Sequence, residues 1–157
     1  MEKVNIKTEI TLCQTNELSE EDKRLVEIAK QSTDNSYSPY SQFKVGAAIL
    51  LENGEIIQGA NQENAAFSVT ICAERSAIFA AQVKYPTIPI KSIAIAARNN
   101  EGFTKEPVSP CGSCRQEMVE IETRYSRPIH ILLYGQKGVY MMDSIRNLMP
   151  LSFVDMK

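Results

Sequence analysis

The sequence predicts an α/β domain in three layers (α-β-α), with helices on both faces of a five-stranded mixed sheet. Helix-forming and strand-forming segments alternate along the 157 residues, which suffice for one compact domain but not comfortably for two. Asn53-Gly54 lies between two apolar segments and predicts a two-residue hairpin turn. The four residues Gly135 to Gly138 are too few for a parallel crossover, so the last two strands should be antiparallel.

Residues 1–18 show little regular pattern and are predicted to form an N-terminal extension, which leaves 19–157 as a single domain. Ser19 precedes three acidic residues and can cap a helix, and apolar residues then recur at helical spacing to about residue 31. Pro39 and its serine-rich neighbours end that helix. The apolar run 43–51 and the run 55–59 form the strands of the predicted hairpin.

The second half of the chain continues the alternation. Residues 72–84 are rich in alanine and predict a helix, 92–97 form a short buried strand, and a further helix begins at Cys111 or Gly112 and ends near residue 125. Apolar runs at 129–134 and 139–142 predict the last two strands, and 143–148 can form a short helix before Pro150. These segments complete a five-stranded sheet.

Charge and composition exclude several classes of partner. The formal net charge is −2 with no Lys/Arg run, so the footprint of a nucleic-acid polymer binder is missing. The N-terminus mixes both charge signs without an apolar core, and no apolar run approaches the ~20 residues that span a bilayer. We therefore expect a cytoplasmic protein without a membrane partner. In a reducing compartment the four cysteines are expected to bind metal or perform chemistry.

Three cysteines are candidate metal ligands. Cys111 and Cys114 are separated by two residues at a predicted helix start, where the helix dipole favours their thiolates, and Cys72 opens the earlier helix in the same way. Three protein ligands leave one tetrahedral position open, which is typical of catalytic rather than structural zinc. We expect one Zn²⁺ per chain. Cys13, in the extension, is not expected to close the site as a fourth ligand.

Glu74 lies two residues after Cys72 and can face the same ion without binding it. A carboxylate beside a zinc-activated water can take its proton and deliver it to a substrate nitrogen. A redox pair of the thioredoxin kind also has two residues between its cysteines, but it leaves Cys72 unexplained. His130 lies inside an apolar strand and is interpreted as structural.

The cysteine and glutamate spacing matches the zinc nucleobase deaminase signature in its three-cysteine form. The chain is identified as similar to the small homotetrameric zinc-dependent cytidine deaminases, over about residues 20–153. The segments that carry the resemblance are Tyr37-Ser38-Pro39-Tyr40-Ser41, Phe43-Lys44-Val45-Gly46-Ala47-Ala48, Asn61-Gln62-Glu63-Asn64-Ala65-Ala66, Cys72-Ala73-Glu74-Arg75 and Cys111-Gly112-Ser113-Cys114-Arg115-Gln116.

The resemblance implies hydrolytic deamination of cytidine and deoxycytidine to uridine and deoxyuridine plus ammonia, in pyrimidine salvage. Zinc-activated hydroxide would attack C4 of the base, with Glu74 as the proton shuttle. Polynucleotide-editing relatives place a helix between the last two strands, so the short Gly135–Gly138 connection favours a free nucleoside. Two alternatives stay open: a deaminase of a modified cytosine nucleoside such as blasticidin S, and a non-catalytic zinc or redox module.

The resemblance also implies roles for the residues around the metal. Asn61 and Glu63 match the pair that holds the ribose 3′-hydroxyl, and an amide and a carboxylate two residues apart on extended chain can share one hydroxyl. Arg75 matches an arginine that compensates the charge of the thiolates. The remaining predicted substrate contacts are the Ala73 amide, the Ser109 carbonyl, the Phe43 ring, and the Phe153 ring in a neighbouring subunit's site.

Overall fold

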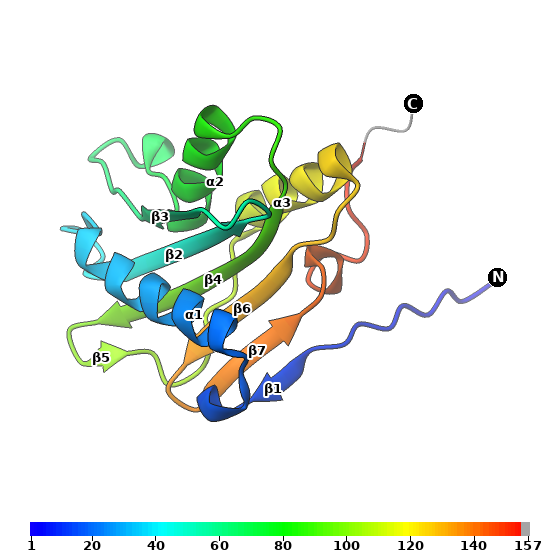
Figure 1. The fold of residues 1–157 in the computed structure, drawn as a ribbon, viewed down its shortest axis with the longest axis horizontal. Coiled ribbons are helices and arrows are strands. Elements are labelled where there is room, and N and C mark those ends of the chain that lie inside the picture. Colours follow the sequence, from blue (N-terminus) through cyan, green and yellow to red (C-terminus); the bar gives the residue numbers. More distant parts are fainter. Residues whose placement is uncertain (155–157) are drawn as a thin grey trace.

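The computed structural model of the chain describes residues 1–154, and Figure 1 shows its arrangement. One sheet runs in the order β1-β7-β6-β4-β2-β3, and β5 pairs with β4. The strands are β1 (Thr11–Cys13), β2 (Lys44–Leu51), β3 (Ile56–Ala60), β4 (Ile90–Asn99), β5 (Gly102–Phe103), β6 (His130–Gly135) and β7 (Gly138–Met142). The helices are α1 (Glu20–Ser32), α2 (Ala73–Lys84), α3 (Gly112–Tyr125) and the 3-10 turns η1 (Thr15–Glu17), η2 (Thr33–Asn35), η3 (Phe67–Val69) and η4 (Ile145–Asn147).

Helices cover both faces of the sheet, which confirms the predicted three layers (Figure 1). Because side chains alternate along a strand, β2 serves two cores. Ala48 and Leu50 pack with α1 on one face, whereas Ala47 and Ile49 pack with α2 and α3 on the other. Among the described residues, no helix combines the length and apolar character needed to cross a bilayer.

The central strand β4 sets the topology. It pairs antiparallel with β2 and parallel with β6, and α3 makes the crossover between the two parallel strands. β6 and β7 are antiparallel, with Gly135 opposite Gly138, as the short connection predicts. This topology brings the starts of α2 and α3 to one end of the sheet. Ligands of open α/β sheets bind beyond strand ends, so a site is expected there.

The hairpin turn differs from the predicted two-residue form. The last backbone bond joins the Leu51 amide to the Glu55 carbonyl at 2.9 Å, so three residues form the loop. Gly54 alone adopts positive φ, at +85°, whereas Asn53 accepts a 3.1 Å side-chain bond from the Glu55 amide. A three-residue loop with glycine in the left-handed region is the common alternative to the two-residue turn.

The sheet has seven strands rather than the five predicted. β5 adds two residues beyond β4, and β1 adds three residues from within the predicted N-terminal extension. β1 pairs with β7, and Cys13 at its end is buried against the α1 face of the sheet. The proposed boundary at residue 19 stays a prediction, and residues 155–157 of the proposed 19–157 domain lie outside the described residues.

Two glycines let helices approach the sheet closely. A Cβ on Gly59 of β3 would lie 2.3 Å from the Ala73 carbonyl oxygen at the start of α2. A Cβ on Gly46 of β2 would lie 2.2 Å from the Ala29 carbonyl oxygen of α1, on the opposite face. Both distances are far below van der Waals contact, so the absent side chains fix the positions of the two helices.

Candidate active site

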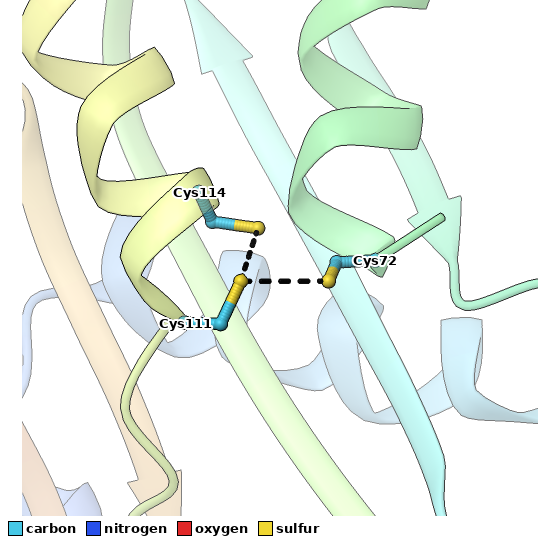
Figure 2. Close-up of side chains that lie close together, drawn as sticks. All are labelled: Cys72, Cys111 and Cys114. Carbon is cyan, nitrogen blue, oxygen red and sulfur yellow. Dashed lines mark hydrogen bonds between the residues drawn. The ribbon is translucent and has the colours of Figure 1, made fainter. Parts of the chain in front are cut away.

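The three predicted ligand cysteines meet where α2 and α3 begin (Figure 2). Cys72 and Cys111 are the N-cap residues of α2 and α3, both with extended backbone, and Cys114 lies in the first turn of α3. The Cys72 and Cys111 sulfurs are 3.7 Å apart, and those of Cys111 and Cys114 are 3.5 Å apart. Neither cap residue's side chain bonds the helix backbone, so the sulfurs are free to face each other.

This geometry fits a zinc ion. Sulfurs at a Zn–S distance of about 2.3 Å on a tetrahedron lie about 3.8 Å apart, close to the spacings found here. All three sulfurs lie within 4.8 Å of one another, and the described residues hold no second such His, Cys or carboxylate group. Cys13 is not among them, because its thiol donates to the Val139 carbonyl at 3.6 Å within the sheet. Three ligands leave the fourth position open.

Charge and hydrogen bonding favour the thiolate form of Cys72. The pKa of Cys72 is lowered to about 5, first by its hydrogen bond with Cys114 and then, against the effect of burial, by Arg75. The Arg75 Nη2 donates to the Cys72 sulfur at 3.8 Å, which is the contact expected of a compensating arginine. The positive ends of two helices add to this effect. The same hydrogen bond and burial raise the pKa of Cys114, so a bound ion would have to displace the Cys114 proton.

Glu74 lies in the first turn of α2, beside the cysteines and almost fully buried, with 4% of its surface exposed. Burial is the main cause that raises the pKa of Glu74 to about 6, and the Cys72 charge acts in the same direction. A carboxyl group with a pKa near neutrality exchanges protons readily in both directions. Position and proton affinity both suit a proton carrier.

A cavity of about 190 Å³ opens beside this cluster. Its wall combines apolar side chains with predicted site residues, so a flat ring with a polar edge fits its chemistry. The lining residues are Val45, Asn61, Glu63, Thr70, Ile71, Cys72, Ala73, Glu74, Ile95, Val108, Ser109 and Cys111. Five of these, Val45, Thr70, Ile71, Ile95 and Val108, are apolar or hydroxyl side chains that sequence reasoning passed over as ordinary core or loop residues.

Asn61 and Glu63 hold the cavity wall together. Asn61 Oδ1 accepts from Ser36 Oγ at 2.6 Å and from the Val45 amide at 2.8 Å, and its Nδ2 donates to the Phe43 carbonyl at 2.9 Å. An amide nitrogen has two hydrogens, so one donor position remains.

Glu63 is tied to the turn before β2. Its carboxylate accepts from the Tyr40 and Ser41 amides at 2.9 and 3.2 Å and from the Ser41 hydroxyl, and the hydroxyl is the main cause that lowers the pKa of Glu63. A carboxylate has about four lone-pair positions, so about one acceptor position remains free. The pair thus keeps one donor and one acceptor, the complement of a single hydroxyl group.

Two predicted aromatic contacts do not line this cavity. Phe43 lies half-buried just before β2, and its backbone carbonyl rather than its ring contacts Asn61. Phe153 is 83% exposed, and its carbonyl accepts from Gln116 Nε2 at 2.8 Å. Both are near site elements through backbone contacts, while their rings are not part of the cavity wall.

Arg115 is a site-supporting residue that sequence reasoning missed. Its Nε donates to the Pro110 carbonyl and its Nη1 to the Leu148 carbonyl, both at 2.8 Å. One guanidinium therefore joins the turn before Cys111 to the C-terminal segment. The sequence feature that could have indicated this role is its position directly after the ligand Cys114. Helix periodicity alone, however, does not predict which groups such a residue contacts.

A family model described as the cytidine and deoxycytidylate deaminase zinc-binding region matches residues 19–126. The chain belongs to this family. The cytidine deaminase of Halalkalibacterium halodurans is 45% identical to this deaminase over 97 residues, 62% of this chain and 69% of that protein. The cytidine deaminase of Sporosarcina psychrophila is 40% identical over 130 residues, 83% of this chain and 89% of that protein.

A solved structure supports the same family assignment. The crystal structure of cytidine deaminase from Burkholderia pseudomallei has a TM-score of 0.73 and 33% identity, and the match covers 87% of this chain and all of that one. The Blasticidin-S deaminase of Bacillus cereus is more distant, at 32% identity over 142 residues, 87% of this chain and 94% of that protein. The predicted cytidine deaminase fold and family are confirmed, and the deaminase is a zinc protein whose cysteine cluster fits the ion.

Proposed function

We propose that this chain catalyses the hydrolytic deamination of cytidine and deoxycytidine to uridine and deoxyuridine with release of ammonia. The observation that carries the proposal is the buried Glu74 carboxyl beside three convergent cysteine sulfurs at the wall of one cavity. Relatives named cytidine deaminase at 40–45% identity support this substrate over the modified nucleoside of the more distant Blasticidin-S deaminase. A role in pyrimidine salvage follows from the reaction.

Each residue has a defined task in this proposal. Cys72, Cys111 and Cys114 hold the zinc. When bound, zinc supplies Lewis-acid chemistry that activates water for attack on the carbon that bears the amino group. Glu74 takes a proton from the attacking water on its carboxylate and delivers it to the ring nitrogen. It then moves a second proton to the amino nitrogen, which leaves as ammonia while the ring carbon keeps the oxygen.

Further contacts orient the substrate. The Ala73 amide is in the first turn of α2, where helix amides lack a partner within the helix, and Ser109 lines the same cavity, so this amide and the Ser109 carbonyl suit a ring edge with one acceptor and one donor. The spare donor of Asn61 and the spare acceptor of Glu63 suit the sugar 3′-hydroxyl. Cytidine lacking that hydroxyl should lose roughly tenfold to hundredfold in kcat/KM, and equal kcat/KM would contradict the assignment.

Replacement of Glu74 by glutamine tests the proton transfer. The variant should retain about one zinc per chain and lose about a hundredfold or more in kcat, because the amide cannot accept the proton. Glu120→Gln, the same change on the exposed face of α3, is the matched control and should retain full turnover. Full turnover in Glu74→Gln would refute the role of the carboxylate.

A nucleoside panel tests the substrate. Ammonia release is measured with cytidine, deoxycytidine, deoxycytidylate and blasticidin S at equal concentration. We expect cytidine and deoxycytidine to be the best substrates. Activity confined to blasticidin S would replace the proposal with the alternative, and absence of turnover on all four with a full zinc content would favour a non-catalytic zinc module.

We also infer a homotetramer with a neighbour-supplied Phe153 ring and a cytoplasmic location. The exposed apolar side chains of Phe79 and Val83 on α2 support contact between copies, and the exposed Phe153 ring supports a role outside its own subunit. Phe153→Ala should raise KM without changing the mass found by light scattering. A fully active monomer would contradict the homotetramer and the contribution of Phe153 from a neighbouring subunit.

A further inference from the structure

In the segment from Val4 to Leu12, called here the edge segment, apolar and polar residues alternate with a period of two. This pattern has no role in the candidate active site. Its even-numbered positions are apolar or threonine and its odd-numbered positions are polar, which is typical of a strand with one apolar face. The apolar residues are exposed rather than buried. Their exposed fractions are 83% for Val4, 48% for Ile6, 45% for Ile10 and 56% for Leu12.

The edge segment lies at an open edge of the sheet. β1 pairs with β7 on one side and ends the strand order on the other, and the preceding residues continue past it as extended chain (Figure 1). Asn147 holds the middle of the segment, because its Nδ2 donates to the Glu9 carbonyl at 2.9 Å and its own carbonyl accepts from the Thr8 hydroxyl. Thr8 and Glu9 are therefore held against the C-terminal segment before any partner is added.

The backbone contact also shows which amides face outward. Successive residues of a strand direct their backbone N–H and C=O groups to opposite edges. Since the Glu9 carbonyl faces Asn147 on the inner side, the backbone groups of Thr8, Ile10 and Leu12 face the outer edge. Exposed edges of this kind pair readily with another strand.

We propose that the edge segment pairs antiparallel with the same segment of a second copy of this chain, about a two-fold axis through Thr8. In that register every apolar residue faces an apolar residue and the lysine faces the glutamate. The facing pairs are Val4 with Leu12, Ile6 with Ile10, Lys7 with Glu9, Asn5 with Thr11, and Thr8 with itself.

The sequence favours this register over its neighbours. Residues with outward amides can pair only with one another, so the segment can slip only in steps that keep even positions opposite even positions. One step in one direction places Lys7 opposite Lys7, and one step in the other places Glu9 opposite Glu9. Like charges directly opposite destabilise a pair of strands, whereas Lys7 opposite Glu9 stabilises it twice by symmetry.

A second copy is the partner that this pattern specifies. The segment is complementary to itself in apolar character and in charge, and an isologous two-fold contact needs this property. Pairing would join two sheets into one, place the apolar side chains of the two copies side by side on one face and remove the open edge. The contact lies on β1, at the opposite end of the strand order from β3, so it leaves the cavity between α2 and α3 open.

Disulfide trapping in the zinc-loaded protein tests the register. In a hydrogen-bonded antiparallel pair the Cα atoms are about 5.5 Å apart, within the disulfide range, so Thr8→Cys should form a linked dimer on a non-reducing gel. Ile6→Cys and Ile10→Cys should each stay unlinked alone, because their self-distances are about 13 Å along the strand. Mixed together, they should link about tenfold faster than either variant by itself. The unchanged protein gives the background from its own cysteines.

Charge exchange tests the same contact without new cysteines. Lys7→Glu and Glu9→Lys should each raise the dissociation constant of this contact roughly tenfold in sedimentation experiments, and the double variant should restore it. Linking of Ile10→Cys with itself at the rate of Thr8→Cys would overturn the register. Equal, background-level linking of all variants would show that the segment contacts something other than a second copy and would overturn the proposal.

Discussion

Replacement of Gly59 by alanine should disturb fold and chemistry together. The added Cβ would lie 2.3 Å from the Ala73 carbonyl oxygen and 2.7 Å from the Ala77 amide nitrogen, and both are backbone atoms of α2 that cannot rotate away. To restore contact distance, α2 must move by about 1 Å. Cys72 and Glu74 flank Ala73 and must move with it.

The expected magnitudes follow from that displacement. Overpacking against backbone should cost about 3 kcal/mol of unfolding free energy, which lowers Tm by roughly 6–12 °C in a chain of this size. A displacement of about 1 Å at a catalytic group can reduce the rate about a hundredfold, so kcat/KM should fall by that factor. Thermal unfolding and steady-state ammonia release measure the two effects on the same sample.

Gly46→Ala separates the two effects. Its Cβ would lie 2.2 Å from the Ala29 carbonyl oxygen, so it displaces α1, which carries no residue of the cavity wall. The loss of Tm should be similar, while zinc affinity and kcat/KM stay near those of the unchanged protein. An unaltered Tm in Gly59→Ala, or equal losses of activity in both variants, would refute the reasoning.

Three further variants probe single contacts. Arg75→Ala removes the cation beside the Cys72 sulfur and should lower zinc affinity or kcat about 10- to 100-fold, as found by metal competition and steady-state kinetics. Glu122→Ala leaves two buried backbone amides without an acceptor and should cost about 2–4 kcal/mol in urea unfolding, with kcat unchanged. Ser41→Ala removes the main cause that lowers the pKa of Glu63. An NMR titration should then show that pKa raised, so the carboxylate contact is lost at a higher pH on acidification. An unshifted titration would show that the backbone amides suffice.

Local signals predicted the elements well and the sheet edges poorly. Ser19 caps α1 as expected, with its Oγ accepting from the Asp22 amide at 3.1 Å, because a cap needs only residues close in sequence. β5 was missed because a strand of two residues has too few positions to show a period of two. β1 was missed because the alternation of residues 4–12 lies mostly ahead of the strand itself, in residues that pair with no other strand of the described chain. Their pairing with β7 and β4 is a tertiary property.

In the metal centre, too, local features could be predicted from the sequence and tertiary contacts could not. The spacing of Cys111 and Cys114 indicates a shared ion by itself, since both lie in one helix turn. That Cys72 joins them from 39 residues away does not follow from spacing, and it was predicted because Cys72 opens a helix as Cys111 does. The hydrogen bonds that hold Asn61 and Glu63 in the cavity wall were also beyond prediction, because they depend on a turn that only the folded chain places beside them.

The position of the cysteines at two separate helix starts has a consequence for folding. An ion held by Cys72 and Cys111 closes a loop that spans 39 residues and contains all of α2 and β4. A covalent cross-link over such a span removes about 4 kcal/mol of chain entropy from the unfolded state, and a tightly bound ion acts in the same sense. Availability of the metal would then set how much of the chain is folded as well as how much is active, so a cell short of zinc would lose the protein itself through its unfolded form.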